Sequence, residues 1–133
     1  MRVLMFSWEY PPHVVGGLGE HVANLVPALA QQGVEVHLLT PRWAGGAAEE
    51  RGEHSVIHRV DPPQTNGDIY TCAWQTNLAL EKYAEGLWAR VGAFDLLHAH
   101  DWLVTFAPVA LKRGLRVPLV ATIHATERGR GRG

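Results

Sequence analysis

The chain has 133 residues, of which 47% are hydrophobic and 19% are charged, and its formal net charge is −1 at pH 7. This length and composition suit one soluble domain with a sizeable core, and they exclude a disordered chain. The near-neutral charge argues against a broad electrostatic surface for nucleic acid, so no nucleic-acid partner is expected.

The first third of the chain predicts a strand, a helix and a second strand. Residues 2–7 (RVLMFS) form a short continuous apolar run, which is typical of a strand covered on both faces. Residues 17–32 carry apolar side chains at helical spacing, Gly33 stands where a helix C-terminal glycine belongs, and Pro27 should kink the helix. Residues 34–40 (VEVHLLT) are predicted to be the next strand, and this strand–helix–strand order favours a parallel sheet.

The rest of the chain predicts a loop, two strands and a helix, followed by a second strand–helix–strand unit. In chain order these segments are residues 41–53, 54–60, 69–73, 74–91, 95–100, 103–113 and 117–124. Two such units indicate an α/β fold with a doubly wound, Rossmann-like, mostly parallel sheet and helices on both faces. The few residues after His124 predict no further helix, so the chain looks cut off.

Polar side chains follow several of the predicted strands. In an open α/β sheet, ligands bind outside the carboxyl ends of the strands. The polar residues at those ends are Ser7, Glu9, His98, His100, Asp101 and His124. The topology therefore predicts a rim of Glu, Asp and His side chains along one edge of the sheet.

Residues 12–22 (PHVVGGLGEHV) place several glycines before a predicted helix. The N–H groups at a helix start suit a phosphate, and Gly17 and Gly19 would let the backbone approach it closely. A turn that simply needs glycines explains the stretch equally well. Val22 replaces the third glycine of a dinucleotide motif and no acidic residue follows the second strand, which argues against a nicotinamide or flavin site. A Walker-type loop is excluded because no Lys-Ser or Lys-Thr follows the glycines.

Other residues have simpler interpretations. His98 and His100 would share one face of a strand, but the sequence signals no third ligand, so no metal is expected. Asp101 suits the N-cap of a helix that begins near Trp102, and this role is compatible with a functional one. Residues outside any motif are predicted to be structural: His37, His54, His58, Trp43, Trp74, Trp88 and Cys72.

The single cysteine, Cys72, indicates the cellular compartment of the protein. It excludes an internal disulfide and favours a reducing compartment. No apolar run reaches ~18 residues, and the N-terminus lacks the apolar segment of a signal peptide. We therefore expect a cytoplasmic protein without a membrane span.

Three motifs resemble those of known enzymes. Residues 7–12 (SWEYPP) with 16–19 (GGLG), residues 97–102 (LHAHDW) and residues 120–124 (VATIH) are similar to motifs of bacterial glycogen and starch synthases, in the family's order and spacing. The resemblance covers almost the whole chain and is weaker between Trp43 and Trp88. It implies the amino-terminal half of a GT-B fold, which is the acceptor side of a glycosyltransferase.

The resemblance also implies roles for individual residues. It places Gly16, Gly17, Gly19 and His21 at the donor diphosphate, His124, Asp101 and His100 as catalytic residues, and Glu9, Trp8 and Trp102 on the rim for sugar and acceptor. Members of the family transfer glucose from a nucleotide-sugar such as ADP-glucose or UDP-glucose to a glucan or another sugar acceptor. They retain the anomeric configuration and usually need no metal, so we expect no cofactor.

The domain organisation follows from the same comparison. Residues 1–126 are predicted to be an incomplete Rossmann-like, acceptor-side domain, and residues 127–133 a flexible Arg/Gly tail. The family's carboxy-terminal, donor-binding domain is missing, so we expect the chain alone to be inactive. The alternative is a stand-alone binding module, or a homo-oligomer that covers exposed apolar surface by self-association.

Overall fold

The computed structural model describes residues 1–14, 16–64 and 67–123 of the chain. Its strands and helices are, in chain order, β1 (Arg2–Ser7), α1 (Gly17–Gln31), β2 (Glu35–Pro41), β3 (Glu49–Gly52), β4 (Ser55–Val60), α2 (Ile69–Val91), β5 (Leu96–His100), the short 3-10 helix η1 (Trp102–Val104), α3 (Phe106–Leu115) and β6 (Leu119–Thr122).

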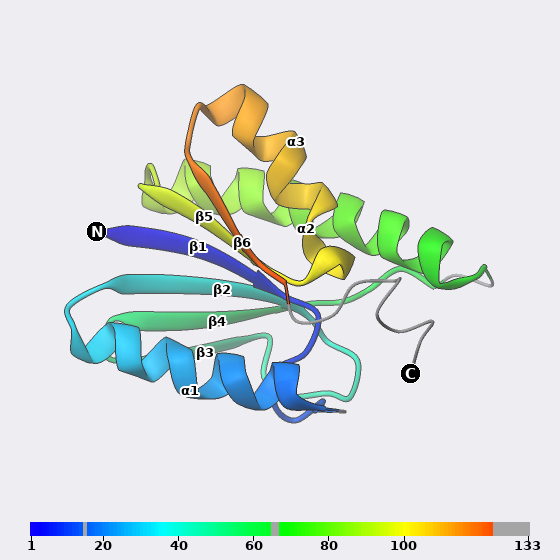
Figure 1. Cartoon of the computed structure of the whole chain (residues 1–133), viewed down its shortest axis with the longest axis horizontal. Helices are drawn as coiled ribbons and strands as arrows, with labels where there is room; N and C mark the ends of the chain where they lie inside the picture. The colour runs from blue at the N-terminus through cyan, green and yellow to red at the C-terminus, as the bar shows by residue number, and fades with distance from the viewer. Residues whose placement is uncertain (15, 65–66, 124–133) are drawn as a thin grey trace.

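The described strands form one six-stranded sheet in the order β3-β4-β2-β1-β5-β6. Neighbouring strands are parallel except β3 and β4, which form an antiparallel pair at one edge. Figure 1 shows α1 on one face of the sheet and both α2 and α3 on the other. The predicted doubly wound, mostly parallel fold is confirmed.

Apolar side chains fill both faces of the central strands because helices cover both faces. Successive residues of a strand point to opposite sides. Leu4 and Phe6 of β1 pack in the cluster beneath α2 and α3, whereas Val3 and Met5 pack in the cluster beneath α1. Burial of each such side chain stabilises the fold by roughly 1.5–3 kcal/mol, which explains why this strand shows no alternation of apolar and polar residues.

Helix α1 ends as the sequence predicts. Gly33 has a φ of 83° and its amide donates to the Ala30 carbonyl at 3.0 Å, the geometry of a glycine that follows a helix. Pro27 lies inside α1 without ending it. The other end of α1, at Gly17, lies beside the carboxyl end of β1, because the crossover from β1 to β2 runs back along the sheet.

Two predicted segments are wrong. Residues 69–73 are not a strand but the beginning of α2, where the Asp68 carboxylate accepts a hydrogen bond from the Thr71 amide at 2.9 Å. A short apolar run fits either structure, and here the N-cap and the helical continuation decide. The predicted loop 41–53 contains β3, whose exposed residues have no apolar pattern and are held by backbone pairing with β4.

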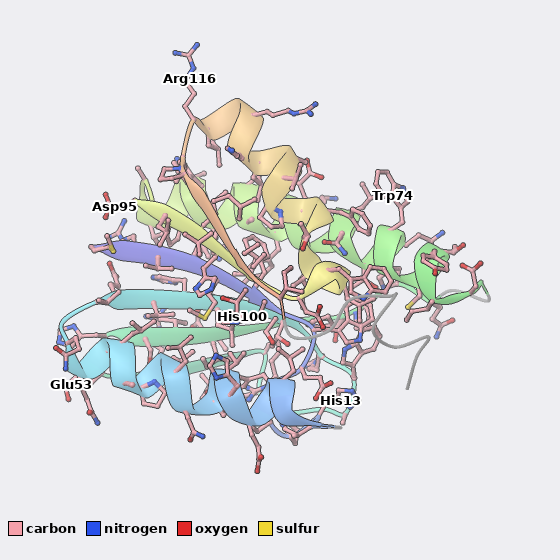
Figure 2. The ribbon with its side chains drawn as sticks, in the orientation of Figure 1. His13, Glu53, Trp74, Asp95, His100 and Arg116 are labelled. Carbon is pink, nitrogen blue, oxygen red and sulfur yellow. The ribbon has the colours of Figure 1, made fainter. Side chains whose placement is uncertain are left out.

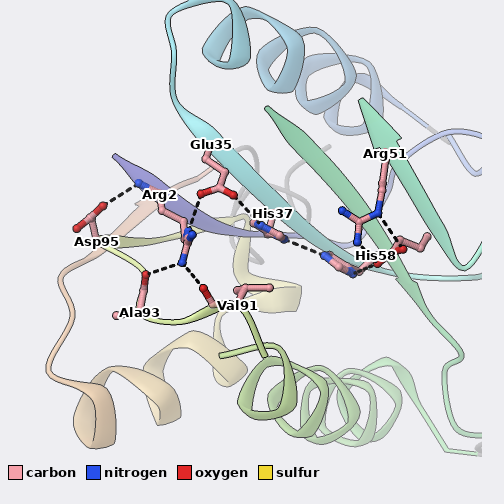
Figure 3. A network of polar contacts seen from close by, with 9 residues as sticks. Arg2, Glu35, His37, Arg51, His58, Val91, Ala93 and Asp95 are labelled. Atoms are coloured by element: carbon pink, nitrogen blue, oxygen red, sulfur yellow. Dashed lines mark hydrogen bonds and ion pairs between the residues drawn. The ribbon is translucent and has the colours of Figure 1, made fainter. Parts of the chain in front are cut away.

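Figure 3 shows a polar network that runs from Arg2 on β1 through Glu35 and His37 on β2 to His58 on β4, and its two histidines are buried. Nδ1 of His37 on β2 is 3.0 Å from Nε2 of His58 on β4, and Nδ1 of His58 is 2.8 Å from the Tyr83 hydroxyl on α2. Burial lowers the pKa of both histidines, that of His58 to about 4. These histidines therefore join three elements as neutral hydrogen-bonding groups.

Candidate functional site

The loop from β1 to α1 places Glu9 against the start of the helix. Ser7 Oγ donates to the Glu9 carbonyl at 2.6 Å, and Glu9 Oε1 accepts a hydrogen bond from the Gly16 amide at 3.3 Å. Gly16 is the N-cap residue and supplies no side-chain cap. The Glu9 carboxylate therefore occupies the Gly16 amide, whereas the amides of the first turn, from Gly17 on, have the polarity that suits an anion.

The three predicted donor-site glycines differ in their surroundings. A Cβ atom on Gly19 would lie 2.9 Å from Val14 Cγ2 and 3.3 Å from Glu9 Cβ, so this glycine is needed for close packing. A Cβ atom on Gly16 or Gly17 would meet no described atom within 4 Å. The described residues therefore leave the space beside Gly16 and Gly17 open, although the Gly16 amide donates to Glu9 Oε1, whereas Gly19 is packed against Val14.

The residue after β5 has a rare backbone conformation. Asp101 has a φ of 73°, which is uncommon for any residue except glycine. Its amide donates to the Thr122 carbonyl at 2.7 Å, and its Oδ1 accepts a hydrogen bond from the Trp102 amide at 2.8 Å. The predicted N-cap role is confirmed, for η1. Such conformations cluster at functional sites, which supports a role for this turn.

Histidines from α1 and β5 meet near this turn. His100, the last residue of β5, is fully buried, and its ring centroid lies 4.1 Å from that of His98 and 5.8 Å from that of His21. Nε2 of His98 is 2.8 Å from Thr122 Oγ1 on the neighbouring strand. Figure 2 shows His100 inside the molecule and His13 on the loops at the carboxyl edge of the sheet. The fold therefore brings predicted donor and catalytic residues together.

The aromatic side chains of the rim form two pairs. The Trp8 and Trp43 ring centroids are 4.9 Å apart, and Trp43 Nε1 donates to the Trp8 carbonyl at 3.0 Å. Trp43, which the sequence predicts to be structural, packs against Trp8 at the rim, because the loop after β2 folds back over the end of β1. The Trp102 ring lies 5.7 Å from that of Tyr70 on α2.

Asn77 of α2 holds the turn that contains η1. Its Nδ2 donates to the Ala73 and Leu103 carbonyls, both at 2.7 Å, and its Oδ1 accepts a hydrogen bond from the Ala107 amide at 2.9 Å. The side chain is buried, so these bonds satisfy an amide that water does not reach. Sequence reasoning missed this residue, since the weak helix propensity of Asn was its one available signal.

Some predicted features lie outside the described residues, namely His124 and the tail 127–133. Among the residues that the structure does describe, no three His, Cys, Asp or Glu side chains gather closely enough to hold a metal ion. In that same part of the chain, no helix has the length and hydrophobicity needed to span a bilayer.

A hollow of about 510 Å³ lies at the opposite edge of the sheet, where the end of α1 meets the turn between β3 and β4. Pro27, Gln31 and His54 are among the residues that line it. Open α/β folds bind their ligands at the carboxyl ends of the strands, and this hollow lies at the amino ends. The candidate site is therefore the carboxyl edge.

Comparison with known proteins identifies the family. Residues 15–133 match the profile of Glycosyltransferase Family 4. The chain belongs to this family. A glycogen synthase of Mycobacterium tuberculosis is 38% identical over 147 aligned positions, which cover 100% of this family 4 chain and 36% of the relative. An uncharacterized glycosyltransferase of Methanocaldococcus jannaschii is 34% identical over 98% of this chain and 32% of its own length.

Solved structures with the same fold are also glycosyltransferases. The catalytic domain of Starch Synthase IV from Arabidopsis thaliana, bound to ADP and acarbose, has a TM-score of 0.67 at 20% identity and aligns with 92% of this chain and 33% of that chain. A sucrose-phosphate synthase from Thermosynechococcus elongatus has a TM-score of 0.69 at 16% identity, over 93% and 33% of the two chains. The predicted resemblance to glycogen and starch synthases and to the GT-B fold is confirmed. The family 4 chain spans about a third of the length of these proteins.

Proposed function

We propose that this chain is the amino-terminal, acceptor-side part of a cytoplasmic, retaining glycosyltransferase. The enzyme transfers glucose or another hexose from ADP-glucose or UDP-glucose to a glucan or another sugar acceptor, without a metal or other cofactor. The observation that carries the proposal is the space that the described residues leave open beside Gly16 and Gly17 at the start of α1, on the same edge of the sheet as His100 and Asp101.

The chemistry of the donor suits a helix start. Departure of a nucleoside diphosphate leaves an oxocarbenium-like sugar and a charged leaving group, so hydrogen-bond donors at the diphosphate lower the barrier. The Gly17 amide is such a donor, the Gly16 amide becomes one when the diphosphate displaces Glu9 Oε1, and His21 in the next turn of α1 adds a side-chain donor. In other enzymes the loss of one donor of this kind lowers kcat by about 10²–10³-fold.

The turn after β5 lies where the donor sugar would bind. His100 and Asp101 are buried in this chain, so they position the turn that faces the sugar, and His124 contacts the donor sugar. Asp101 fixes the turn because its carboxylate caps η1. The faces of Trp8 and Trp102 offer stacking surfaces for sugar rings, with Glu9 beside them.

Inorganic pyrophosphate tests the donor side of the proposal. In spectra of the ¹⁵N-labelled chain, pyrophosphate should shift the amide peaks of Gly16 and Gly17 more than those of Gly33 and Gly92, which follow the ends of α1 and α2. Those ends carry partial negative charge and should repel the anion. A response confined to other residues would contradict the donor assignment.

Transfer assays test the reaction itself. The chain alone should release no nucleoside diphosphate from ADP-glucose or UDP-glucose in the presence of a glucan, because it spans about a third of its relatives. Addition of the remaining carboxy-terminal portion of the Mycobacterium tuberculosis glycogen synthase should restore release. Transfer by the chain alone would show that the site is complete without a second domain.

An exposed apolar surface favours a second candidate function, a self-associating module. We call this surface the helix-pair patch, and it comprises Ile69, Tyr70, Trp74, Leu78, Phe106 and Val109 of α2 and α3. Trp74 is 56% exposed, and its ring centroid lies 5.8 Å from that of Phe106. Exposed apolar patches commonly mark surfaces that another protein covers.

A further inference from the structure

Arg59 places a buried charge at the carboxyl end of β4. Its side chain is 5% exposed. Nη2 donates to the Pro11 carbonyl at 2.7 Å, and Nη1 donates to the Ala47 carbonyl at 2.9 Å. Pro11 belongs to the loop before α1, and Ala47 belongs to the loop between β2 and β3. One guanidinium therefore joins two loops that are far apart in the sequence.

The loop between β2 and β3 lies directly on Arg59. A Cβ atom on Gly46 would lie 2.8 Å from Arg59 Nε and 3.0 Å from Pro12 Cδ. Gly46 has a φ of 90°, so this close approach needs a glycine for its backbone as well as for its size. On another side, the guanidinium carbon lies 5.7 Å from the centroid of the Tyr10 ring. The guanidinium is thus enclosed by loop atoms and held in one place.

A contribution to folding stability does not explain well why the charged side chain of Arg59 is buried. Its ion-pair partner, Glu50, is 3.1 Å away and has a side chain 56% exposed. Desolvation of a buried charge offsets most of the gain from such a pair. Arg59 Nε also has no hydrogen-bond partner among the described residues. What the planar guanidinium supplies is geometry, since it holds two carbonyl groups at fixed relative positions.

Contacts made by residues 10–14 connect the Pro11 carbonyl, which Arg59 holds, to helix α1. The His13 amide donates to the Tyr10 carbonyl at 3.0 Å, which closes a tight turn around Pro11. Val14 then packs against Gly19 inside α1. We therefore expect a displacement of the Pro11 carbonyl to move Val14 and, through its contact with Gly19, the first turn of α1.

We infer that Arg59 is a positioning residue for the diphosphate site at Gly16 and Gly17. It acts through the Pro11 carbonyl and the loop, and it does not itself contact the diphosphate. This role rests on the proposed function, because it concerns the same donor site.

Arg59→Lys tests the role, with Arg42→Lys as the matched control. Lysine keeps the charge, but a single ammonium does not reproduce the fork that holds both carbonyls. Arg42 follows β2 at the same edge of the sheet and pairs instead with Asp61, at 2.7 Å and 3.0 Å. R59K should weaken pyrophosphate binding, followed at the Gly16 and Gly17 amide peaks, roughly two- to thirty-fold, whereas R42K should leave it unchanged.

Spectra without pyrophosphate separate this role from the proposed function. If the unmodified chain shows no response to pyrophosphate, the donor proposal fails. The positioning role of Arg59 is then tested by the amide peak positions of Gly16 and Gly17 without ligand. Peaks displaced in R59K but not in R42K support positioning. Equal peak positions together with equal pyrophosphate affinity in R59K and R42K overturn it.

Arg59→Met provides the same measurements should R59K fail to fold, because it removes the buried charge while keeping an apolar stem. Urea unfolding of each variant gives the folded fraction, and affinities are compared for folded protein. A positioning role lowers affinity in the folded fraction, whereas a purely structural role lowers the free energy of unfolding and leaves that affinity unchanged.

Discussion

A methyl group on Gly19 would lie 2.9 Å from Val14 Cγ2, which is closer than carbon atoms pack. We therefore expect Gly19→Ala to lower the free energy of unfolding by about 1–3 kcal/mol, the usual cost of overpacking. Gly17→Ala meets no described atom and should leave the free energy of unfolding unchanged or slightly higher, since alanine favours helix. Urea unfolding of both variants provides the measurement.

The order of the two variants should reverse for pyrophosphate affinity, which Gly17→Ala should lower more than Gly19→Ala does. The Gly17→Ala methyl group would occupy the side from which a ligand approaches, so binding should weaken. Gly19→Ala acts indirectly, by displacing Val14, so its affinity in the folded fraction should fall less than that of Gly17→Ala. Equal destabilisation by the two substitutions would contradict the division between a packing glycine and a binding glycine.

At the scale of elements, α2 is joined to the sheet by polar contacts as well as by apolar packing. Charged groups face His37 and His58 from several elements: Arg2 on β1, Glu35 on β2, Glu49 and Arg51 on β3, and Arg90 on α2. Burial is the largest influence, and it lowers the pKa of both histidines in spite of the nearby carboxylates. Protonation of the pair therefore opposes the attachment of α2.

The lowered pKa of His58 makes the free energy of unfolding depend on pH. This pKa is about 4 in the folded chain and about 6.5 in an unfolded one, so the unfolded chain binds more protons between these pH values. Stability should thus be complete above about pH 6.5 and should decrease by roughly 3 kcal/mol as the pH falls to about 4. Urea unfolding at a series of pH values measures the slope.

His58→Gln should reduce that slope, because the substitution removes one of the two buried histidines whose pKa is lowered. His54→Asn is the control, since His54 is exposed in the turn between β3 and β4 and its φ of 61° suits asparagine. The control should keep the slope of the unmodified chain. A slope in His58→Gln as steep as that of the unmodified chain would assign the pH dependence to other groups.

At the scale of the whole molecule, we expect any self-association of the chain to occur through the helix-pair patch. Trp74→Lys should reduce concentration-dependent association in sedimentation experiments, and it should change the free energy of unfolding by less than about 0.5 kcal/mol because Trp74 is largely exposed. Ala89→Lys adds the same charge at an exposed position farther along α2 and should not affect association. An unmodified chain that is monomeric at every concentration would count against the self-associating module.

Patterns within a few residues were enough to predict much of this molecule. The apolar run of β1, the helical spacing of α1 with Gly33 after it, and the cap at Asp101 each depend on local backbone chemistry. The order of these elements then predicted the parallel sheet and the edge at which polar residues gather. Local pattern failed at β3, since backbone pairing with β4 holds this strand and its side chains carry no periodicity.

Packing of distant segments was needed for the rest. The hydrogen bond from Arg59 to the Pro11 carbonyl, the contact between His37 and His58, and the difference between Gly17 and Gly19 all arise where loops and elements meet in space. Whether a polar group is desolvated, and which partner it then finds, depends on what the sheet order brings beside it. A linear pattern of residue types carries no record of those neighbours.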